Sequence, residues 1–489
     1  MKNHAKKTLL AILPAIVILF SASAQTNVSG GIFANTTWSA ANSPYIITSS
    51  VVVYPGIVLT IQPGVTVKFA DGQVLEIRQA QLISTGTSVA PITFTSNSGS
   101  PAAGIYSGIY LNGVNVSHTF DYCNFTYADY AIRTNSSSSL SITNSSFISN
   151  NTGVSAGPAT SVTIDNSLFR FNANNGIYIT GGSVSNSRIV QNGTGLDLLG
   201  NPATVTNCVV DSNSTGVNNA YATFSHCSFS HNVMGLYYGG MTLDSCTVNY
   251  NQTGIGTLIG STVKNSVIDF NTSVGVNIIW SGATIRNCEI KNNATGIADY
   301  REGNLSYPHN TITNNIIEND SIGILLAMHG ENVYCNKICN NTAYGIKYTD
   351  PQNTSVANNY WCTPDSASTE AVIYDAHDNI GSGILTIMPL DTVQCYLNNP
   401  TATGIINYGA GNFSFNIFPN PATTNLTITL PDTVSNAEIR IFNMVGELEY
   451  ASTTIKSITQ IDVTNFESGM HIVQLTMGNS VARQKFIKQ

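Results

Sequence analysis

The sequence predicts an all-β protein, in which a long parallel β-helix solenoid is followed by a small β-sandwich. Three observations predict this fold class. A unit of about 21 residues repeats through most of the 489-residue chain. Within each unit apolar and polar residues alternate as in half-buried strands, and no 3.6-residue period competes. Residues 413–489 keep the alternation but lose the repeat.

Composition narrows the classes of function. Only 9% of residues are charged, against roughly 25% in ordinary domains, and the formal net charge is -8. A nucleic-acid-binding protein needs a basic face for the phosphate backbone, so no nucleic-acid partner is expected. The low content of charged residues also excludes a charge-rich coiled coil or a charge-rich disordered chain.

Residues 1–24 have the pattern of a secretory signal peptide. Three lysines within residues 2–7 precede the apolar run Leu9–Phe20, and the small residues Ser21–Ala24 follow. The alternative is a buried N-terminal helix. No later stretch has the ~18 apolar residues of a membrane span, so no transmembrane segment is expected. The mature protein is therefore expected to be secreted or held on the outer-membrane cell surface.

Residues 25–395 are assigned to the solenoid, with residues 25–116 as N-terminal capping coils and residues 117–395 as regular repeats. In the capping coils, short apolar runs are separated by Pro-Gly and Asp-Gly turns. These runs are Val51–Val53, Val58–Ile61, Val65–Phe69 and Val74–Ile77.

The regular repeat is V-x-N-[S/C]-x-φ-x-x-N-x-x-G-φ, where φ is apolar and the first Asn is the marker position. The marker residues are Tyr122, Asn144, Asn166, Asn186, Asn207, His226, Ser245, Asn265, Asn287, Asn314, Cys335 and Asn358. The residues two before and three after the marker are apolar in every unit, which predicts one inward strand face. Stacked coils of this kind bury one continuous core.

Two further columns of the repeat lead to expectations about the backbone. An Asn recurs six residues after the marker, as at Asn150 and Asn172, and suits a left-handed or bridge-region backbone conformation and a hydrogen bond to its copy one coil away. A Gly follows, as at Gly153 and Gly176, and is expected to supply a positive φ.

These repeats resemble the right-handed parallel β-helix family of secreted carbohydrate-active proteins and the related copper-maturation proteins. The Asn-Asn-Tyr-Trp of residues 358–361 resembles the Asn-x-Tyr-Trp-Gly ending of such repeats, with Cys362 in place of Gly. The resemblance covers roughly residues 30–395. It implies contact with polysaccharide, either by a binding protein or by an enzyme. Lyases of this family hold calcium with clustered acids and use a basic residue, whereas its glycosidases use close carboxylates.

Residues 396–412 are assigned to a linker and residues 413–489 to a separate β-sandwich. Strands are expected at Leu426–Leu430, Glu438–Phe442, Gln460–Val463 and His471–Met477. The segment resembles the type A sorting domain of the type IX secretion system of Bacteroidetes. The matching motif residues include Pro419, Asn420, Pro421, Gly446 and Gly469.

The resemblance to a sorting domain implies export by the type IX secretion machinery, removal of the domain, and release or anchoring to surface lipopolysaccharide. His471 stands where that family usually has Tyr. The alternative is an ordinary adhesion module.

The nine cysteines fall into two groups. Five directly follow a marker, in a slot otherwise filled by Ser, and are expected to be buried and inert. Cys339 and Cys362 lie four residues after markers of adjacent coils, within disulfide reach, so we expect them to be bonded. A Cys335–Cys395 bond is a weaker expectation, and a zinc site made from the same cysteines is disfavoured by their spacing.

Catalytic residues cannot be assigned from the sequence, because the acids are few and scattered. Asp211, Asp269 and Glu318 share one outward column but not consecutive coils, so we interpret them as solvated surface charges. The richest segment is the insertion at residues 298–309. It adds acids, an Arg and aromatic residues to one flank of the solenoid.

If the protein has a site, we expect it in the groove beside this insertion, although a polar loop covering the flank explains the same residues and is favoured. The candidate catalytic residues are Asp299, Arg301, Glu302 and His309. The candidate sugar-binding residues are Trp280, Tyr300, Tyr348 and Asp350.

Two classes of function remain open, namely a non-catalytic polysaccharide-binding or surface-structural protein and a polysaccharide lyase or glycoside hydrolase acting in the groove. Scarce acids favour the first class, and the resemblance favours the second. No cofactor and no metal site are expected, except calcium if the protein is a lyase.

Overall fold

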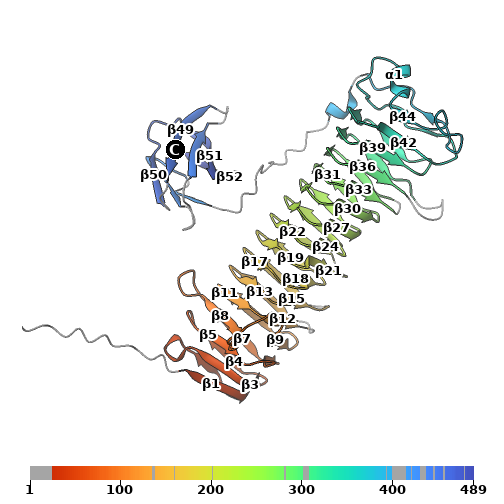
Figure 1. The fold of residues 1–489 in the computed structure, drawn as a ribbon. Coiled ribbons are helices and arrows are strands. Elements are labelled where there is room, and N and C mark those ends of the chain that lie inside the picture. Colours follow the sequence, from red (N-terminus) through yellow and green to blue (C-terminus); the bar gives the residue numbers. More distant parts are fainter. Residues whose placement is uncertain are drawn as a thin grey trace, which may run out of the picture. The chain divides into compact units, whose positions relative to one another are not determined.

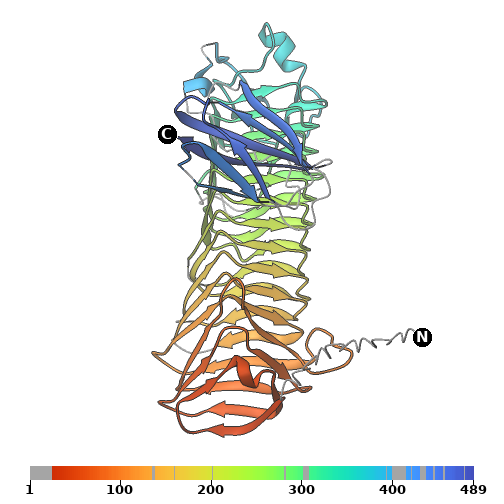
Figure 2. The same cartoon turned by 90° about the vertical axis from the view of Figure 1, so that its left-hand side faces the viewer.

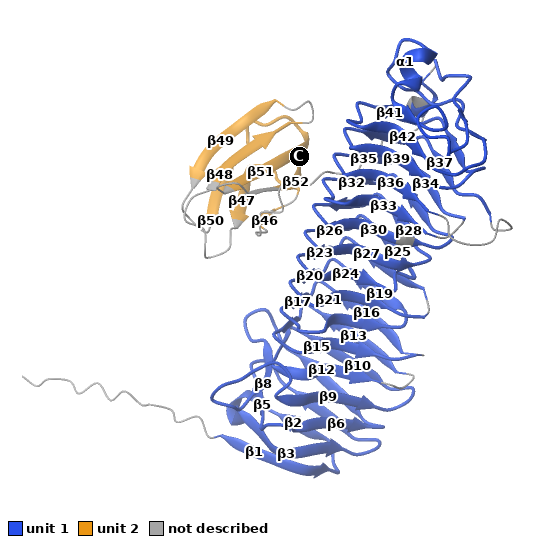
Figure 3. Cartoon of the chain, turned by 45° about the vertical axis from the view of Figure 1, so that its right-hand side comes forward, with its two compact units in different colours: residues 1–404 blue, residues 405–489 orange. Residues whose placement is uncertain are grey.

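The computed structural model describes residues 25–489, except 135–137, 159, 201, 280–281, 301–307, 393, 399–414, 420, 430–436, 444–446, 455–457 and 478–479. The predicted signal peptide, residues 1–24, and most of the predicted linker lie outside the described residues. The chain divides into two compact units, residues 1–404 and 405–489 (Figure 3).

The first unit is a solenoid whose coils each contribute one strand to each of three parallel stacks (Figures 1 and 2). The second and third stacks join at the long strand β3, and neighbouring coils pair in parallel throughout. The first stack comprises β2 (Thr36–Trp38), β4 (Val58–Ile61), β7 (Gln81–Thr85), β10 (Ser117–Asp121), β13 (Ser139–Thr143), β16 (Ser161–Asp165), β19 (Gly182–Ser185), β22 (Ala203–Thr206), β25 (Ala222–Ser225), β28 (Thr242–Asp244), β31 (Thr262–Lys264), β34 (Thr284–Arg286), β37 (Thr311–Thr313) and β40 (Asn332–Tyr334).

The second stack comprises β5 (Thr66–Phe69), β8 (Ile92–Ser96), β11 (Cys123–Thr126), β14 (Ser146–Ile148), β17 (Leu168–Arg170), β20 (Arg188–Val190), β23 (Val209–Asp211), β26 (Ser228–Ser230), β29 (Thr247–Asn249), β32 (Val267–Asp269), β35 (Glu289–Lys291), β38 (Ile316–Glu318) and β41 (Lys337–Cys339). The third stack comprises β1 (Thr26–Ile32), β3 (Tyr45–Val53), β6 (Val74–Arg78), β9 (Tyr106–Asn112), β12 (Ala128–Thr134), β15 (Thr152–Ala156), β18 (Asn175–Ile179), β21 (Thr194–Leu198), β24 (Thr215–Asn218), β27 (Met234–Gly239), β30 (Thr253–Leu258), β33 (Val274–Ile278), β36 (Thr295–Asp299), β39 (Ile322–Leu326), β42 (Tyr344–Tyr348) and β44 (Ile373–Tyr374).

The core follows the two apolar columns of the repeat. Phe125, Phe147 and Phe169 are paired in register on adjacent coils, and their rings stack with centroids 4.7 and 4.6 Å apart. Their neighbours along each strand point outward and are partly exposed, as strand alternation requires. Because every coil repeats this pattern, the solenoid has a single continuous core.

The left-handed backbone expected at the Asn column is found at other positions of each coil. The positive φ angles occur at the marker and at the residue five after it, as at Asn144 (50°) and Ser149 (57°). Asn150, one residue later, is fully buried and is not among the positive-φ residues. Its amide donates to Asn172 Oδ1 over 3.1 Å, so the expected bond between coils is confirmed. We call this column of buried amides the Asn ladder.

The glycine column corrects the second expectation, because none of its members is among the positive-φ residues. Glycine is needed there for close approach instead. A Cβ on Gly216 would lie 2.4 Å from the carbonyl oxygen of Gly235, and a Cβ on Gly153 would lie 2.5 Å from that of Gly176. The coils could not stack at this distance with any larger residue.

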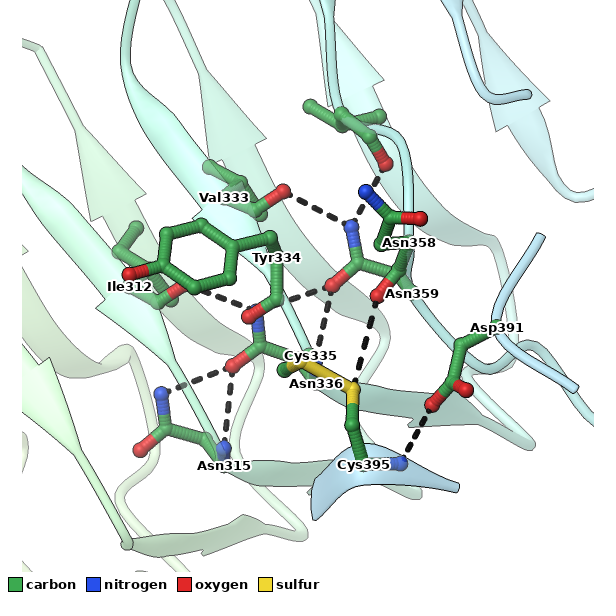
Figure 4. The surroundings of a disulfide bond; sticks show 11 residues. Ile312, Asn315, Val333, Tyr334, Cys335, Asn336, Asn358, Asn359, Asp391 and Cys395 are labelled. Carbon is green, nitrogen blue, oxygen red and sulfur yellow. Dashed lines mark hydrogen bonds between the residues drawn. A yellow bond between two sulfur atoms is a disulfide. The ribbon is translucent and has the colours of Figure 1, made fainter. Parts of the chain in front are cut away.

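The C-terminal end of the solenoid is irregular and held by two disulfides. It contains β43 (Thr354–Ser355), α1 (Ser366–Glu370), β45 (Leu385–Thr386) and the 3₁₀-helix η2 (Cys395–Asn398); a second 3₁₀-helix, η1 (Ala40–Asn42), lies near the other end. Cys339 is bonded to Cys362 and Cys335 to Cys395, with Cα atoms 5.6 and 5.4 Å apart. Figure 4 shows the Cys335–Cys395 bond. Cys335–Cys395 ties η2 to the last regular coils, and Asp391 accepts the Cys395 N–H. The other five cysteines are free and buried, as expected.

The second unit is a sandwich of two antiparallel sheets that share one apolar core. One sheet contains β46 (Asn416–Phe418), β47 (Asn425–Thr429) and β50 (Ile458–Asp462), and the other contains β48 (Ala437–Phe442), β49 (Leu448–Thr454), β51 (Gly469–Met477) and β52 (Ser480–Lys488). All four expected strands are present within one or two residues of their predicted bounds. The strands β46, β49 and β52 were not predicted.

No helix in the described part of the chain is long and apolar enough to span a membrane.

Candidate functional site

The predicted groove is only partly within the described residues. Trp280, Arg301 and Glu302 lie outside them, as does most of the insertion. Tyr300, directly after β36, is 46% exposed and remains accessible to a ligand.

Asp299 and Tyr348 were predicted to line the groove, but both side chains point into the protein. The Asp299 side chain is fully buried, and its carboxylate accepts hydrogen bonds of 3.1 and 3.3 Å from the Asn310 amide. Tyr348 belongs to the solenoid core, and its hydroxyl donates to the Gln352 carbonyl. Burial raises the pKa of Tyr348. A buried ring cannot stack on a sugar, and on β42 it is Lys347 that points outward.

The remaining predicted residues form two separate contacts. The His309 Nδ1 atom lies 3.9 Å from Glu331 Oε1, and Glu331 accepts the backbone N–H of Asn310. Asp350 is nearly buried and lies 3.2 Å from His329 Nδ1, while it also accepts the N–H of Gln352 over 2.8 Å. The described residues therefore do not form the open acid-and-aromatic groove that the sequence predicted.

A different group of charges gathers on the outward face of the second stack. It consists of Asp269, Glu289, Lys291, Glu318 and Lys337, from four consecutive coils, and we call it the charged cluster. The register aligns Asp269 with Lys291 and Lys291 with Glu318.

Lys291 is at the centre of the charged cluster. Its Nζ lies 2.9 Å from Glu289 and 3.6 Å from Glu318, and Lys337 Nζ lies 2.8 Å from the other oxygen of Glu318. Burial opposes the charged form, but the ion pairs with Glu289 and Glu318 hold the pKa of Lys291 above its usual value. Lys291 and Lys337 thus join the carboxylates of two neighbouring strands, Glu289 on β35 and Glu318 on β38.

Asp269 differs from the other acids of the cluster. Burial, assisted by the charge on Glu289 and opposed by Lys291, raises its pKa to about 6. Among the described residues, its buried Oδ1 atom has no hydrogen-bond partner. Asp269 is thus a carboxyl group that titrates close to neutral pH and has an oxygen able to take another bond.

Three exposed rings line the corner next to the charged cluster, and we call them the ring column. They are His231, Tyr250 and Phe270, each directly after a strand of the second stack. The rings stack in parallel at 5.3 and 5.2 Å. His231 Nδ1 also lies 2.9 Å from Asp211, which occupies the same position in its coil as Asp269 and Glu318, four residues after the marker.

The charged cluster could have been found in the sequence. The column four residues after the marker reads Asp269, Lys291, Glu318 on consecutive coils, but a search for acids alone passes over the Lys between them. The ion pairs show that these acids are not isolated surface charges. Glu289, two residues before Lys291, reaches the same cluster because outward side chains alternate along β35.

One further set of residues, at the C-terminal end of the solenoid, could hold a metal ion. Glu370, Asp375 and His377 place one ligand atom each within 4.8 Å of one another. The sequence analysis did not predict this set, because it lies outside the repeat and carries no standard metal-binding motif.

Comparisons with known proteins agree with this architecture. A right-handed β-helix region model matches residues 82–234, a model for a periplasmic copper-binding protein (NosD) matches residues 183–375, and a secretion system C-terminal sorting domain model matches residues 416–489. Of the sorting motif, Pro419, Pro421 and Gly469 are described, whereas Asn420 and Gly446 are not.

Individual relatives are distant or cover little of the chain. An ulvan lyase, NLR42, of Nonlabens ulvanivorans is 40% identical over 76 residues, which are 15% of this chain and 14% of that protein. The periplasmic alginate epimerase AlgG is 9% identical, covers 71% of this chain and 75% of its own, and has a TM-score of 0.27. An alginate lyase from Paenibacillus sp. str. FPU-7 is 13% identical, covers 69% and 93%, and has a TM-score of 0.18.

The solenoid with its two apolar columns, the separate sandwich and the three family matches lead to one conclusion. The chain is a secreted right-handed parallel β-helix protein with a C-terminal sorting domain of the type IX secretion system.

Proposed function

We propose that this protein binds polysaccharide on the outward face of the second stack, at the charged cluster and the adjoining ring column. The observation that carries the proposal is the gathering of three carboxylates and two lysines beside three exposed rings. Elsewhere the outward columns of this low-charge chain are mainly Ser, Thr and Asn.

The chemistry of the cluster suits a sugar chain. Carboxylates accept hydrogen bonds from sugar hydroxyls, lysines donate them, and exposed rings pack against the apolar faces of pyranose units. Lys291 and Lys337 balance two of the three negative charges, so a neutral or weakly acidic polymer is favoured over a strongly anionic one.

The match to a segment of an ulvan lyase fits polysaccharide as the partner. That segment is only 14% of the lyase, so its activity is not transferred to this chain. The sorting domain fits the type IX machinery as a second partner, while anchoring to lipopolysaccharide stays a prediction.

Cleavage of a glycosidic bond is the second candidate function, and the pKa of Asp269 favours it. A carboxyl group with a pKa of about 6 can donate a proton to a leaving oxygen near neutral pH. Glu289 and Glu318 would then be the other carboxylates of the same site. The described part of the predicted groove gives less support, because Asp299 is buried.

Binding is tested with the purified protein on a panel of insoluble plant, algal and bacterial polysaccharides. Lys291→Ala should lose retention on the polymer that the unmodified protein binds. The matched control is Lys264→Ala, which breaks a 2.9 Å ion pair with Asp244 on the first stack. Equal retention of both variants would rule out the charged cluster as the binding surface.

Release of reducing ends from the same panel distinguishes binding from cleavage. Release that Asp269→Asn abolishes, with retention unchanged, would make the protein an enzyme at this site. A polymer that is bound but not cleaved would leave the binding function alone. The calcium expected of a lyase is tested by repeating the assay with a chelator.

A further inference from the structure

The segment that closes the C-terminal end of the solenoid brings together three side chains of metal-ligand type. Glu370 is the last residue of α1, Asp375 directly follows β44, and His377 lies two residues later. His377 Nδ1 is 2.9 Å from Glu370 Oε1 and 2.9 Å from Asp375 Oδ1. Two carboxylate oxygens thus converge on one imidazole nitrogen.

We propose that Glu370, Asp375 and His377 bind a divalent transition-metal ion of the zinc type. Zinc binds imidazole nitrogen and carboxylate oxygen at about 2.0–2.2 Å, so two of its ligands lie about 3.3–3.6 Å apart in a tetrahedral site. The two separations of 2.9 Å are shorter than this range, so the side chains must move apart by about half an ångström to admit the ion. Calcium and magnesium prefer all-oxygen sites, so the imidazole favours a transition ion.

Asp375 is fixed before any ion binds. Its side chain is fully buried; Oδ2 accepts the Leu385 N–H over 2.8 Å, and Oδ1 accepts the His377 N–H over 2.8 Å. These bonds set the direction of the carboxylate and leave Oδ1 facing the imidazole. Burial alone would raise the pKa of Asp375, but the bonds from His377 and Leu385 hold it below its usual value. Asp375 is therefore held by the backbone with Oδ1 directed at the imidazole of His377.

Glu370 is fixed by the short helix that carries it. The side chain of Asp365 caps α1 by accepting the Ser368 N–H over 2.7 Å. The helix ends at Glu370, and its carboxylate is then held against His377. The ligands thus come from one short segment whose backbone is ordered by its own hydrogen bonds.

The position of the site suggests what the ion does. β44 pairs with β42, the preceding strand of the third stack, through Ile346 and Ile373. An ion shared by α1 and the turn after β44 would tie these two parts of the terminal segment together and stiffen the strand that pairs with β42. The open strand edge of the last regular coil would then stay covered. The ion would therefore stabilise the C-terminal end in addition to the two disulfides.

The test uses the purified untagged protein, stripped of metal with a chelator and titrated with zinc chloride in a calorimeter. We expect one zinc ion per chain. Glu370→Gln and His377→Gln should each weaken binding by at least tenfold, because each removes one of the three ligands. His231→Gln is the matched control, since His231 forms a similar 2.9 Å contact with Asp211, and no third ligand joins that pair among the described residues.

Unfolding temperature provides a second readout. Zinc should raise it for the unmodified protein and for His231→Gln but not for His377→Gln. Far-UV circular dichroism checks that each variant folds, and both altered side chains are at least partly exposed. Absence of stoichiometric zinc binding, or binding that both ligand variants retain, would overturn the proposal. Binding of calcium in preference to zinc would overturn the assignment to a transition ion.

Discussion

The Asn ladder gives the sharpest prediction about stability, through the change Asn232→Ala. The Asn232 side chain is 2% exposed. Its Oδ1 accepts the backbone N–H of Asn213 at 2.9 Å and the Asn213 amide at 3.1 Å, and its amide donates to the Val210 carbonyl at 3.1 Å. It also donates to Asn251 Oδ1 at 3.1 Å.

The magnitude follows from the groups that lose their partner. Alanine leaves the Asn213 backbone N–H and one N–H of the Asn213 side-chain amide without an acceptor, and the Val210 carbonyl loses a donor; the other amide N–H keeps its bond to the Ile189 carbonyl. Each buried unsatisfied polar group costs about 1–3 kcal/mol. Partial entry of water lowers the sum, so we expect the free energy of unfolding to fall by about 3–6 kcal/mol.

The assay is guanidinium unfolding followed by circular dichroism, together with hydrogen exchange at the backbone N–H of Asn213. Asn174→Ala is the control, because Asn174 is exposed and lies two residues from the ladder member Asn172. We expect the control to change stability by less than about 0.5 kcal/mol. A fall of less than about 1 kcal/mol in the free energy of unfolding for Asn232→Ala, or unchanged exchange protection of the Asn213 backbone N–H, would refute the reasoning.

Three further predictions concern the solenoid. Asp320 replaces Asn in the ladder, and burial raises its pKa to about 7, above the unfolded value near 3.9, so the contribution of Asp320 to stability should fall as the pH rises from 4 to 7. Asp320→Asn should therefore raise the unfolding midpoint more at pH 7 than at pH 4. An equal rise at both pH values would contradict this. Gly216→Ala should lower the unfolding temperature by several degrees, because its Cβ would lie 2.4 Å from the Gly235 carbonyl oxygen, and an unchanged temperature would show that the coils can separate locally. Cys339→Ser should speed proteolysis after residue 362 while leaving coils near the N-terminus protected, as peptide mapping by mass spectrometry would show; uniform protection would contradict the role assigned to the bond.

The solenoid was predictable because each coil repeats the same physical requirement. An inward position such as Phe147 must be apolar in every copy, so the pattern is visible without any structure. The reasons behind two columns were not predictable. Gly153 is required by a carbonyl oxygen of the next coil, a contact that is not local in the sequence, and the positive φ at Ser149 falls in a column whose residue types vary too widely to reveal it.

The candidate site was less predictable, because it depends on contacts between coils. The Lys291–Glu318 ion pair joins residues of adjacent coils, and a search for acids alone did not reveal it. Tyr348 was assigned to the surface although it stands three residues after Gly345, a position that is buried in other coils, as at Ile278 and Leu326. The Cys339–Cys362 bond was anticipated correctly, since both residues occupy the same place in adjacent coils.

The most direct test of the proposed function is the retention of the purified protein on the polysaccharide panel, measured for the unmodified chain, Lys291→Ala and Lys264→Ala. The account predicts that at least one polymer retains the unmodified protein and Lys264→Ala, and that Lys291→Ala passes through. Retention of all three proteins on every bound polymer, or of none on any polymer, would contradict it.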